Sequence, residues 1–120
     1  MEDIALDELR ARLGDDGLFV LDVRTAPEFG GLAGAPCDPR QGHIEGARNL
    51  PLDRLLRCGS ADELRALVGV PRGSEIVVYC HSGQRSAFAV QVLESVGYRA
   101  RNYPGSWHEW SREPALPAES

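Results

Sequence analysis

Short apolar runs alternate with segments of helical periodicity along this chain of 120 residues. The runs in GLFVLDVR and SEIVVYC have the length of strands buried on both faces, and further short strands are expected around Ala47–Leu50 and in ARNY. Helices are expected over residues 5–13, 53–58, 60–68 and 84–96, with a last helical turn in GSWHEW. This alternation predicts an α/β domain built on a mainly parallel sheet, in which ligands bind beyond the carboxyl ends of strands.

The composition is that of one globular domain, with 42% hydrophobic and 26% charged residues. A net charge of −5 argues against a broad nucleic-acid-binding face, and no apolar run is long enough to cross a membrane. The acidic N-terminus MEDIALDELR is unlike a secretory signal, and three cysteines without an export signal indicate free thiols and a cytoplasmic location. We expect a single domain over residues 1–120 in which the Pro- and Ala-rich tail, residues 113–120, frays.

The main chemical feature is a thiol, Cys80, between the end of a strand and the start of a helix. The first N–H groups of a helix lack partners inside the helix and carry partial positive charge. Successive loop N–H groups also form anion-binding nests, so a thiolate at this position is stabilised and its pKa is lowered. Gly83 allows a tight turn, Ser82 and Ser86 offer hydroxyl donors, and Arg85 adds a guanidinium. The pattern therefore indicates a nucleophilic cysteine rather than a buried structural one.

The spacing between the cysteine and the arginine separates two chemistries. Only four residues lie between Cys80 and Arg85, one fewer than in the Cys–Arg loop of cysteine phosphatases. A phosphoryl group needs a wide cradle with donors around three oxygens, whereas a single sulfur atom carried on the cysteine needs a small one. The shorter loop favours sulfur transfer over phosphatase or arsenate reductase activity.

Four motifs in order are similar to those of the rhodanese (thiosulfate sulfurtransferase) family: LDVRTAPEF, GHIEGARNLPL, VVYCHSGQRSA and NYPGSWHEW. The resemblance covers about residues 3 to 112. It implies an α/β rhodanese-like domain whose central, mainly parallel sheet has five strands and helices on both faces. It also implies a sulfurtransferase that moves a sulfane sulfur through a persulfide on the cysteine. The long segment between Phe29 and Gly42 makes the chain similar to the catalytic half of two-domain sulfurtransferases.

The resemblance and the residues together assign the site. Cys80 is expected to be catalytic, with no metal and no cofactor. The residues expected to bind substrate are His81, Ser82, Gly83, Gln84, Arg85, Ser86 and Arg40. A structural role near the site is expected for Asp22, Arg24, Glu28 and His43, with the first two forming an ion pair or tethering loops.

The donor and the acceptor stay open. Thiosulfate is the first expectation, with cyanide, a small thiol or a thiol protein as acceptor. The small-Ser-Gly pattern after the cysteine is closer to 3-mercaptopyruvate sulfurtransferases, although His81 departs from it. A sulfur carrier serving one protein partner is a third reading, and a non-catalytic rhodanese-type binding module is disfavoured because Cys80 is present. His81 either tunes the thiolate and selects the donor or is simply exposed.

The remaining cysteines, histidines and tryptophans are assigned structural or neutral roles. Cys37 is expected to be a free loop thiol rather than a partner for a disulfide with Cys80, and Cys58 an ordinary helical residue. The cysteines and histidines lack the CxxC or HxxxH spacing that zinc sites favour, so a metal site is not expected. Trp107 and Trp110 share a helical face and are expected to pack in the core or against the site loop.

Overall fold

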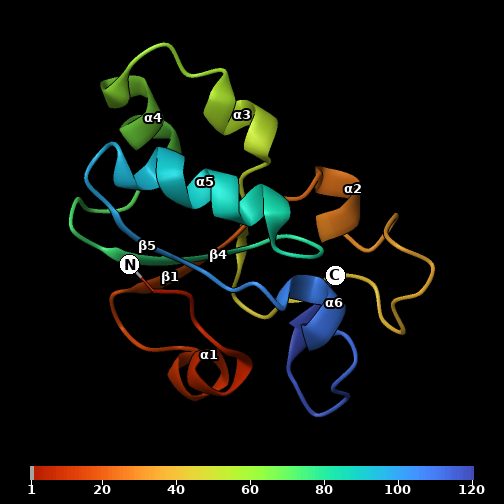
Figure 1. Ribbon diagram of the computed structural model, residues 1–120. Helices are drawn as coiled ribbons and strands as arrows, with labels where there is room; N and C mark the ends of the chain where they lie inside the picture. Colours follow the sequence, from red (N-terminus) through yellow and green to blue (C-terminus); the bar gives the residue numbers. More distant parts are fainter. Residues whose placement is uncertain (1) are drawn as a thin grey trace.

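The structure is a computed structural model that describes residues 2–120. Its centre is a parallel sheet with the strand order β3-β1-β4-β5 (Figure 1). The strands are β1 (Leu18–Asp22), β3 (Arg48–Asn49), β4 (Glu75–Tyr79) and β5 (Arg99–Asn102). Strands β1 and β4 pair over their full length, from Leu18 beside Glu75 to Asp22 beside Tyr79. The predicted α/β class and parallel sheet are confirmed.

Helices cover both faces of this sheet (Figure 1). Helices α3, α4 and α5 lie on one face, and α1 and α6 lie on the other. Their bounds, with that of the short α2, are α1 (Leu6–Arg12), α2 (Ala26–Phe29), α3 (Leu52–Leu56), α4 (Ala61–Val68), α5 (Gln84–Glu94) and α6 (Ser106–Trp110). Within residues 2–120, no helix has the length and apolar character needed to cross a membrane.

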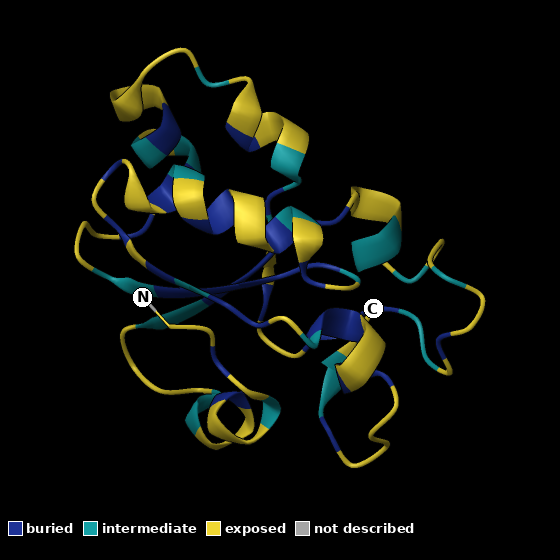
Figure 2. Cartoon of the chain, in the orientation of Figure 1, coloured by how far each residue is buried: buried dark blue, intermediate teal, exposed yellow. Residues whose placement is uncertain are grey.

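Two apolar cores result, one on each face of the sheet. In β4, Ile76 and Val78 point into the core beneath α3–α5, while Val77 and Tyr79 point into the core beneath α1 and α6. This alternation explains why the whole strand is apolar, and Figure 2 shows the central strands as the most buried part of the chain. Trp110 is fully buried in the second core, as expected for a packing residue.

The central sheet has four strands in the described chain rather than the expected five. The remaining two strands, β2 (His43–Ile44) and β6 (Ala118–Glu119), form a separate antiparallel pair. This pair contacts the central sheet through a side chain, because the amide of Ile44 donates to the Tyr79 hydroxyl at 3.0 Å.

The expectation that residues 113–120 fray is wrong. Besides pairing β6 with β2, this segment buries Leu116, which is 2% exposed, in the second core. The indole Nε1 of Trp110 donates to the carbonyl of Pro117 at 3.0 Å. Burial of one leucine and closure of a strand pair order a tail whose local composition alone favours disorder.

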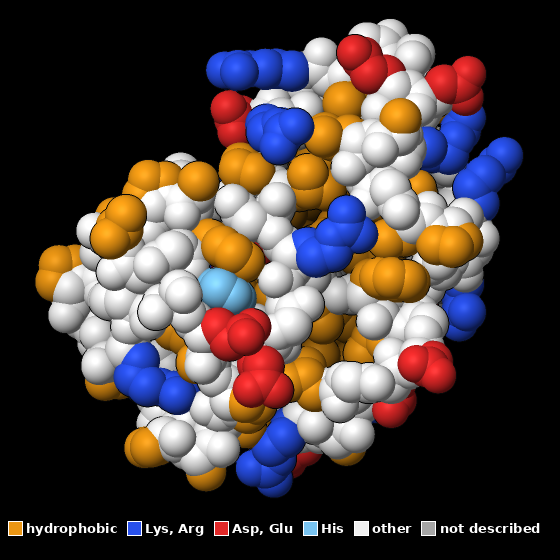
Figure 3. All heavy atoms as spheres, turned by 180° about the vertical axis from the view of Figure 1, so that it is seen from behind, with side chains coloured by type: hydrophobic (Ala, Val, Ile, Leu, Met, Phe, Trp, Pro, Cys, Tyr) orange, Lys and Arg blue, Asp and Glu red, His pale blue; other side chains and the backbone are white. Residues whose placement is uncertain are grey.

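Charge is distributed without a dominant sign on the face of the molecule drawn in Figure 3. Arginine side chains on that face are spread among acidic and apolar ones. The chain has 13 basic and 18 acidic residues in total, which gives a net charge of −5.

Candidate active site

Cys80 lies immediately after β4, at the carboxyl edge of the sheet, and only 1% of the residue is exposed. Helix α6 holds its backbone from outside the loop. The amide of Cys80 donates to Ser106 Oγ at 3.1 Å, and its carbonyl accepts from the amide of Trp107 at 2.9 Å. The next carbonyl, that of His81, accepts from the amide of His108 at 3.0 Å. The nucleophile predicted from the sequence is therefore positioned by two elements, β4 and α6.

The thiol faces a small set of donors at the start of α5. The amide of Gly83 lies 3.1 Å from Cys80 Sγ, and Ser86 Oγ lies 3.4 Å from it. Burial opposes ionisation, but hydrogen bonds from Ser86, Gly83 and Ser82 outweigh it and lower the pKa of Cys80 below its ordinary value. The nest inferred from the sequence thus surrounds the sulfur, and it provides what a thiolate nucleophile needs.

Gly83 is the position in this loop that tolerates no side chain. Its φ is +93°, and a Cβ atom there would lie 2.7 Å from the carbonyl oxygen of Pro104. The Gly83 carbonyl in turn accepts from Asn102 Nδ2 at 3.2 Å. The loop that carries the thiol is therefore packed directly against the segment between β5 and α6.

We predict that Gly83→Ala displaces this loop and removes the Gly83 amide from the sulfur. The pKa of Cys80 should then rise toward that of a free thiol, and the free energy of unfolding should fall by about 1–3 kcal/mol. The pH dependence of alkylation by iodoacetamide measures the first effect, and urea denaturation measures the second.

Gly73→Ala is the matched control for Gly83→Ala. Gly73 has a similar φ of +82°, but a Cβ atom there would meet nothing within 4 Å. The control should lose stability through backbone strain alone and leave the alkylation profile unchanged. If both variants shift the profile equally, close packing against Pro104 does not position the thiol.

Arg85 forms an ion pair with Glu28. Its Nη1 and Nη2 atoms lie 3.0 and 3.3 Å from the two carboxylate oxygens of Glu28. Burial raises the pKa of Glu28, but this effect is smaller than the opposite effect of Arg85 and of the amide and hydroxyl of Thr25. The pKa of Glu28 is therefore lowered to about 2. Glu28 also completes a capping box with Thr25 at the start of α2. The guanidinium expected to attract an anionic donor is thus paired with a fixed negative charge.

Asp22 and Arg24 form the ion pair expected from their place at the end of β1. Arg24 Nη2 lies 2.7 Å from Asp22 Oδ2, and both side chains are almost fully buried. Arg24 also donates to the carbonyl of Gly42 at 2.5 Å and lies 5.3 Å from the ring centre of Trp107. The pair ties the long loop and α6 to the strand beside the nucleophile.

Two further predicted residues lie away from the sulfur. His43 stacks on Phe29 with ring centres 3.6 Å apart, and its Nδ1 is 2.7 Å from the carbonyl of Phe29, so its contacts are structural. The guanidinium of Arg40 donates to four backbone carbonyls between α6 and the tail, those of Trp110, Ser111, Glu113 and Leu116. These bonds occupy Arg40, and we therefore remove it from the set expected to bind substrate.

The remaining loop residues differ in exposure. Ser82 and Gln84 are exposed at the loop surface, whereas His81 is half-buried, with its Nε2 3.0 Å from Asp38 Oδ2. His81 thus contacts the long loop and is not simply exposed.

Sequence reasoning missed Ser106 and Asn102, which hold the loop from β5 and α6. Ser106 has a φ of 55°, a conformation uncommon outside glycine. Its role depends on packing between distant segments, which no local pattern reports.

Comparison with known proteins agrees with this geometry. A model of the Rhodanese-like domain family matches residues 5–113. The putative thiosulfate sulfurtransferase SseB of Mycobacterium tuberculosis is 36% identical over 87% of this chain and 39% of its own length. The sulfur carrier protein TtuD of Thermus thermophilus is 38% identical over 82% of this chain and 40% of its own length.

A solved structure described as a probable thiosulfate sulfurtransferase is 46% identical, with a TM-score of 0.83. It aligns over 98% of this chain and 47% of its own length. The chain spans about two fifths of the length of the two curated relatives. The matched residues include the whole Cys80 loop and every strand of the central sheet, and the chain belongs to the rhodanese-like domain family.

Proposed function

We propose that this chain is a sulfurtransferase that carries a sulfane sulfur as a persulfide on Cys80. The observation that carries the proposal is the contact of Cys80 Sγ with the Gly83 amide and Ser86 hydroxyl, which lower the pKa of a buried thiol. The names of the relatives, a thiosulfate sulfurtransferase and a sulfur carrier, support the same chemistry. No cofactor takes part in the proposed reaction.

In the first half-reaction, the Cys80 thiolate attacks the outer sulfur of thiosulfate. A bond forms between Cys80 Sγ and that sulfur, and the sulfur–sulfur bond of thiosulfate breaks, so sulfite leaves with the bonding electron pair. The product is a persulfide anion. The donors that lower the pKa of the thiol are placed to stabilise this anion as well, because it is held at the same loop.

In the second half-reaction, an acceptor attacks the outer sulfur of the persulfide. Cyanide would leave as thiocyanate and a thiol as a new persulfide, and in both cases the electron pair returns to Cys80 as thiolate. Splitting the transfer into two steps through a covalent intermediate predicts ping-pong kinetics. A small thiol or a thiol protein is the proposed alternative acceptor.

Kinetics with two donors tests the proposal and its main alternative. Thiosulfate and 3-mercaptopyruvate are compared side by side, each with cyanide and with a dithiol as acceptor. Turnover with ping-pong kinetics and one sulfur atom added to the Cys80 peptide, detected by mass spectrometry, would support a sulfurtransferase. Loading of Cys80 without turnover would instead support a carrier that serves one protein partner.

3-Mercaptopyruvate is the second candidate donor because of the loop itself. Ser82 and Gly83 match the last two positions of the small-Ser-Gly pattern, while His81 departs from the first, and the nearest arginine in sequence, Arg85, is paired with Glu28. A paired cation favours a dianionic donor less than a free one does. Higher kcat/KM with 3-mercaptopyruvate than with thiosulfate would assign the chain to this branch.

The same ion pair argues against phosphate-ester chemistry. A phosphatase loop needs its arginine to face the anion, whereas Arg85 donates through both terminal nitrogens to Glu28. We expect no hydrolysis of aryl phosphates above the level of a Cys80→Ser variant.

We predict that Glu28→Gln improves the binding of thiosulfate. Glutamine retains the size and capping ability of the side chain at this helix position but removes its charge, which frees the positive charge of Arg85. Because the Arg85 side chain is 38% exposed and screened by solvent, we expect KM for thiosulfate to fall by roughly threefold to tenfold, about 1 kcal/mol. Initial rates at fixed cyanide concentration measure this change.

Glu8→Gln provides the control, because Glu8 on α1 pairs with Arg101 on β5 rather than with the Cys80 loop. It should leave KM unchanged. A rise in KM for thiosulfate in Glu28→Gln would mean that the carboxylate orients Arg85 for the donor, which contradicts the prediction.

A further inference from the structure

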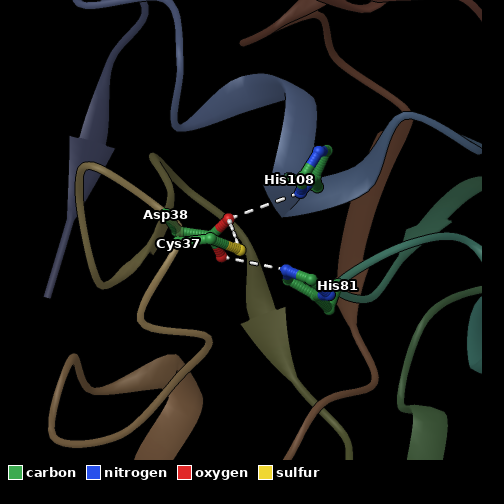
Figure 4. Close-up of side chains that lie close together, drawn as sticks. All are labelled: Cys37, Asp38, His81 and His108. Atoms are coloured by element: carbon green, nitrogen blue, oxygen red, sulfur yellow. Dashed lines mark hydrogen bonds and ion pairs between the residues drawn. The ribbon is translucent and has the colours of Figure 1, made fainter.

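Four side chains that bind metals in many proteins converge beside the active-site loop (Figure 4). Cys37 and Asp38 come from the long loop, His81 follows the nucleophile, and His108 comes from α6. One ligand atom from each lies within 4.8 Å of those of the other three. We propose that these four residues form a binding site for a divalent transition-metal ion, with Zn²⁺ as the preferred ion.

The chemistry of the set matches zinc. A thiolate, a carboxylate and two imidazoles are the ligand types that Zn²⁺ takes in tetrahedral sites. Bond lengths of roughly 2.0–2.3 Å place the ligand atoms of such a site about 3.3–3.6 Å apart. Asp38 Oδ2 lies 3.0 Å from His81 Nε2, whereas Asp38 Oδ1 lies 3.5 Å from His108 Nδ1 and 3.9 Å from Cys37 Sγ. The carboxylate as a whole is therefore within about 4 Å of the other three ligand atoms, close to the tetrahedral spacing.

A buried polar atom at the centre of the cluster supports a bound ion independently. Only 1% of the Asp38 side chain is exposed, and its Oδ2 atom accepts no hydrogen bond in the described chain, although it lies 3.0 Å from His81 Nε2. The Nε2 atom of His81, which faces it, is also buried without a hydrogen-bond partner. Buried polar atoms without partners destabilise a protein, and coordination of one ion would satisfy both.

Arg112 is the charged neighbour that the site must accommodate. Its Nη1 donates to Asp38 Oδ1 at 2.9 Å, and its Nη2 donates to the carbonyl of Cys37 at 3.0 Å. Arg112 therefore shares Oδ1 with His108 and Cys37, while Oδ2 accepts no hydrogen bond and is open to the metal. The negative charges of the Asp38 carboxylate and the Cys37 thiolate together balance the two positive charges of the ion. With Arg112 included, the site carries one net positive charge.

No pair of these residues has a zinc-like spacing along the chain, so the sequence alone predicts no metal site. The ligands come from three segments that only the fold brings together, so their spacing along the chain carries no signal. The proposal revises that expectation. The site is also distinct from the thiol nest, because Cys80 is not one of its ligands.

The test uses protein that carries Cys80→Ser, so that the nucleophilic thiolate cannot bind the metal. After removal of metals with EDTA, titration with ZnCl2 by calorimetry should show one ion per chain with a Kd of about 10 μM or tighter. A hundredfold excess of Zn²⁺ over Kd should raise Tm by roughly 10 °C. Co²⁺ should give the visible absorption of a tetrahedral thiolate complex.

Variants of exposed ligands test the assignment without endangering the fold. His108→Gln and Cys37→Ser, each added to Cys80→Ser, should weaken Zn²⁺ binding by about a hundredfold. Cys37→Ser should also remove the cobalt–thiolate absorption. Cys58→Ser, which changes the thiol that contacts the Arg54 carbonyl outside the cluster, should change neither. The proposal is overturned if the Cys80→Ser protein binds no Zn²⁺ at 100 μM, or if binding is unchanged in both ligand variants.

Discussion

Cys80→Ser should reduce sulfur transfer by at least about 10³-fold, to the background rate. A serine hydroxyl does not ionise near neutral pH and cannot form a persulfide, so the covalent intermediate of the proposed reaction is lost. Serine is nearly the same size as cysteine and can accept the same hydrogen bonds from the Gly83 amide and the Ser86 hydroxyl. The variant should therefore fold normally. Thiocyanate formation from thiosulfate and cyanide measures the effect.

Cys58→Ser is the matched control for this experiment, because it removes a free thiol that lies outside the cluster of Cys37, Asp38, His81 and His108. This variant should retain activity, and after exposure to thiosulfate the added sulfur should still appear on the Cys80 peptide. Thiocyanate formation by Cys80→Ser, if it persisted at a tenth of the original rate, would place the nucleophile elsewhere.

Arg24→Met should lower the free energy of unfolding by about 3–5 kcal/mol. The substitution fills much of the same volume but leaves the carboxylate of Asp22 buried at 0% exposure without its cation. It also removes the bond to the Gly42 carbonyl and the stacking of the guanidinium over Tyr79 and Trp107. Urea denaturation at neutral pH, followed by tryptophan fluorescence, measures the loss.

Two further variants show whether the loss of stability in Arg24→Met comes from the unpaired charge of Asp22. Arg12→Met removes a more exposed pair with Glu75, and it should cost no more than about 1 kcal/mol. The double variant Asp22→Asn/Arg24→Met removes both charges, and it should lose less than the sum of the single losses, because no lone buried charge remains. Additive losses would show that lost packing, not an unpaired charge, explains the effect of Arg24→Met.

The sequence predicted best what is determined locally. The apolar run of β4, the glycine-containing turn and the periodic segment of α5 are consecutive in the chain, and the physics of a helix N-terminus acts within a few residues. Cys80 and its nest could therefore be inferred without knowledge of the fold. Asp22 and Arg24 were also predictable, because charges at the end of a buried strand need partners.

Predictions that depended on contacts between distant segments were less successful. Arg40 was expected to face the donor, but its charge satisfies carbonyls of a tail that the sequence suggested would fray. The partner of Arg85, Glu28, was placed near the site, yet nothing in the local pattern showed that the two would pair. The cluster around Asp38 joins three segments, and no spacing rule could have found it.

The hold of α6 on the backbone of Cys80 and His81 bears on protein engineering. The amides of Trp107 and His108 and the hydroxyl of Ser106 bond to the backbone of Cys80 and His81 rather than to the Cys80 thiol. Libraries designed to change donor choice usually vary the residues that line a pocket. In this scaffold only the bond to Ser106 uses a side chain of α6, so Ser106→Ala would release the Cys80 amide while every loop side chain stays the same.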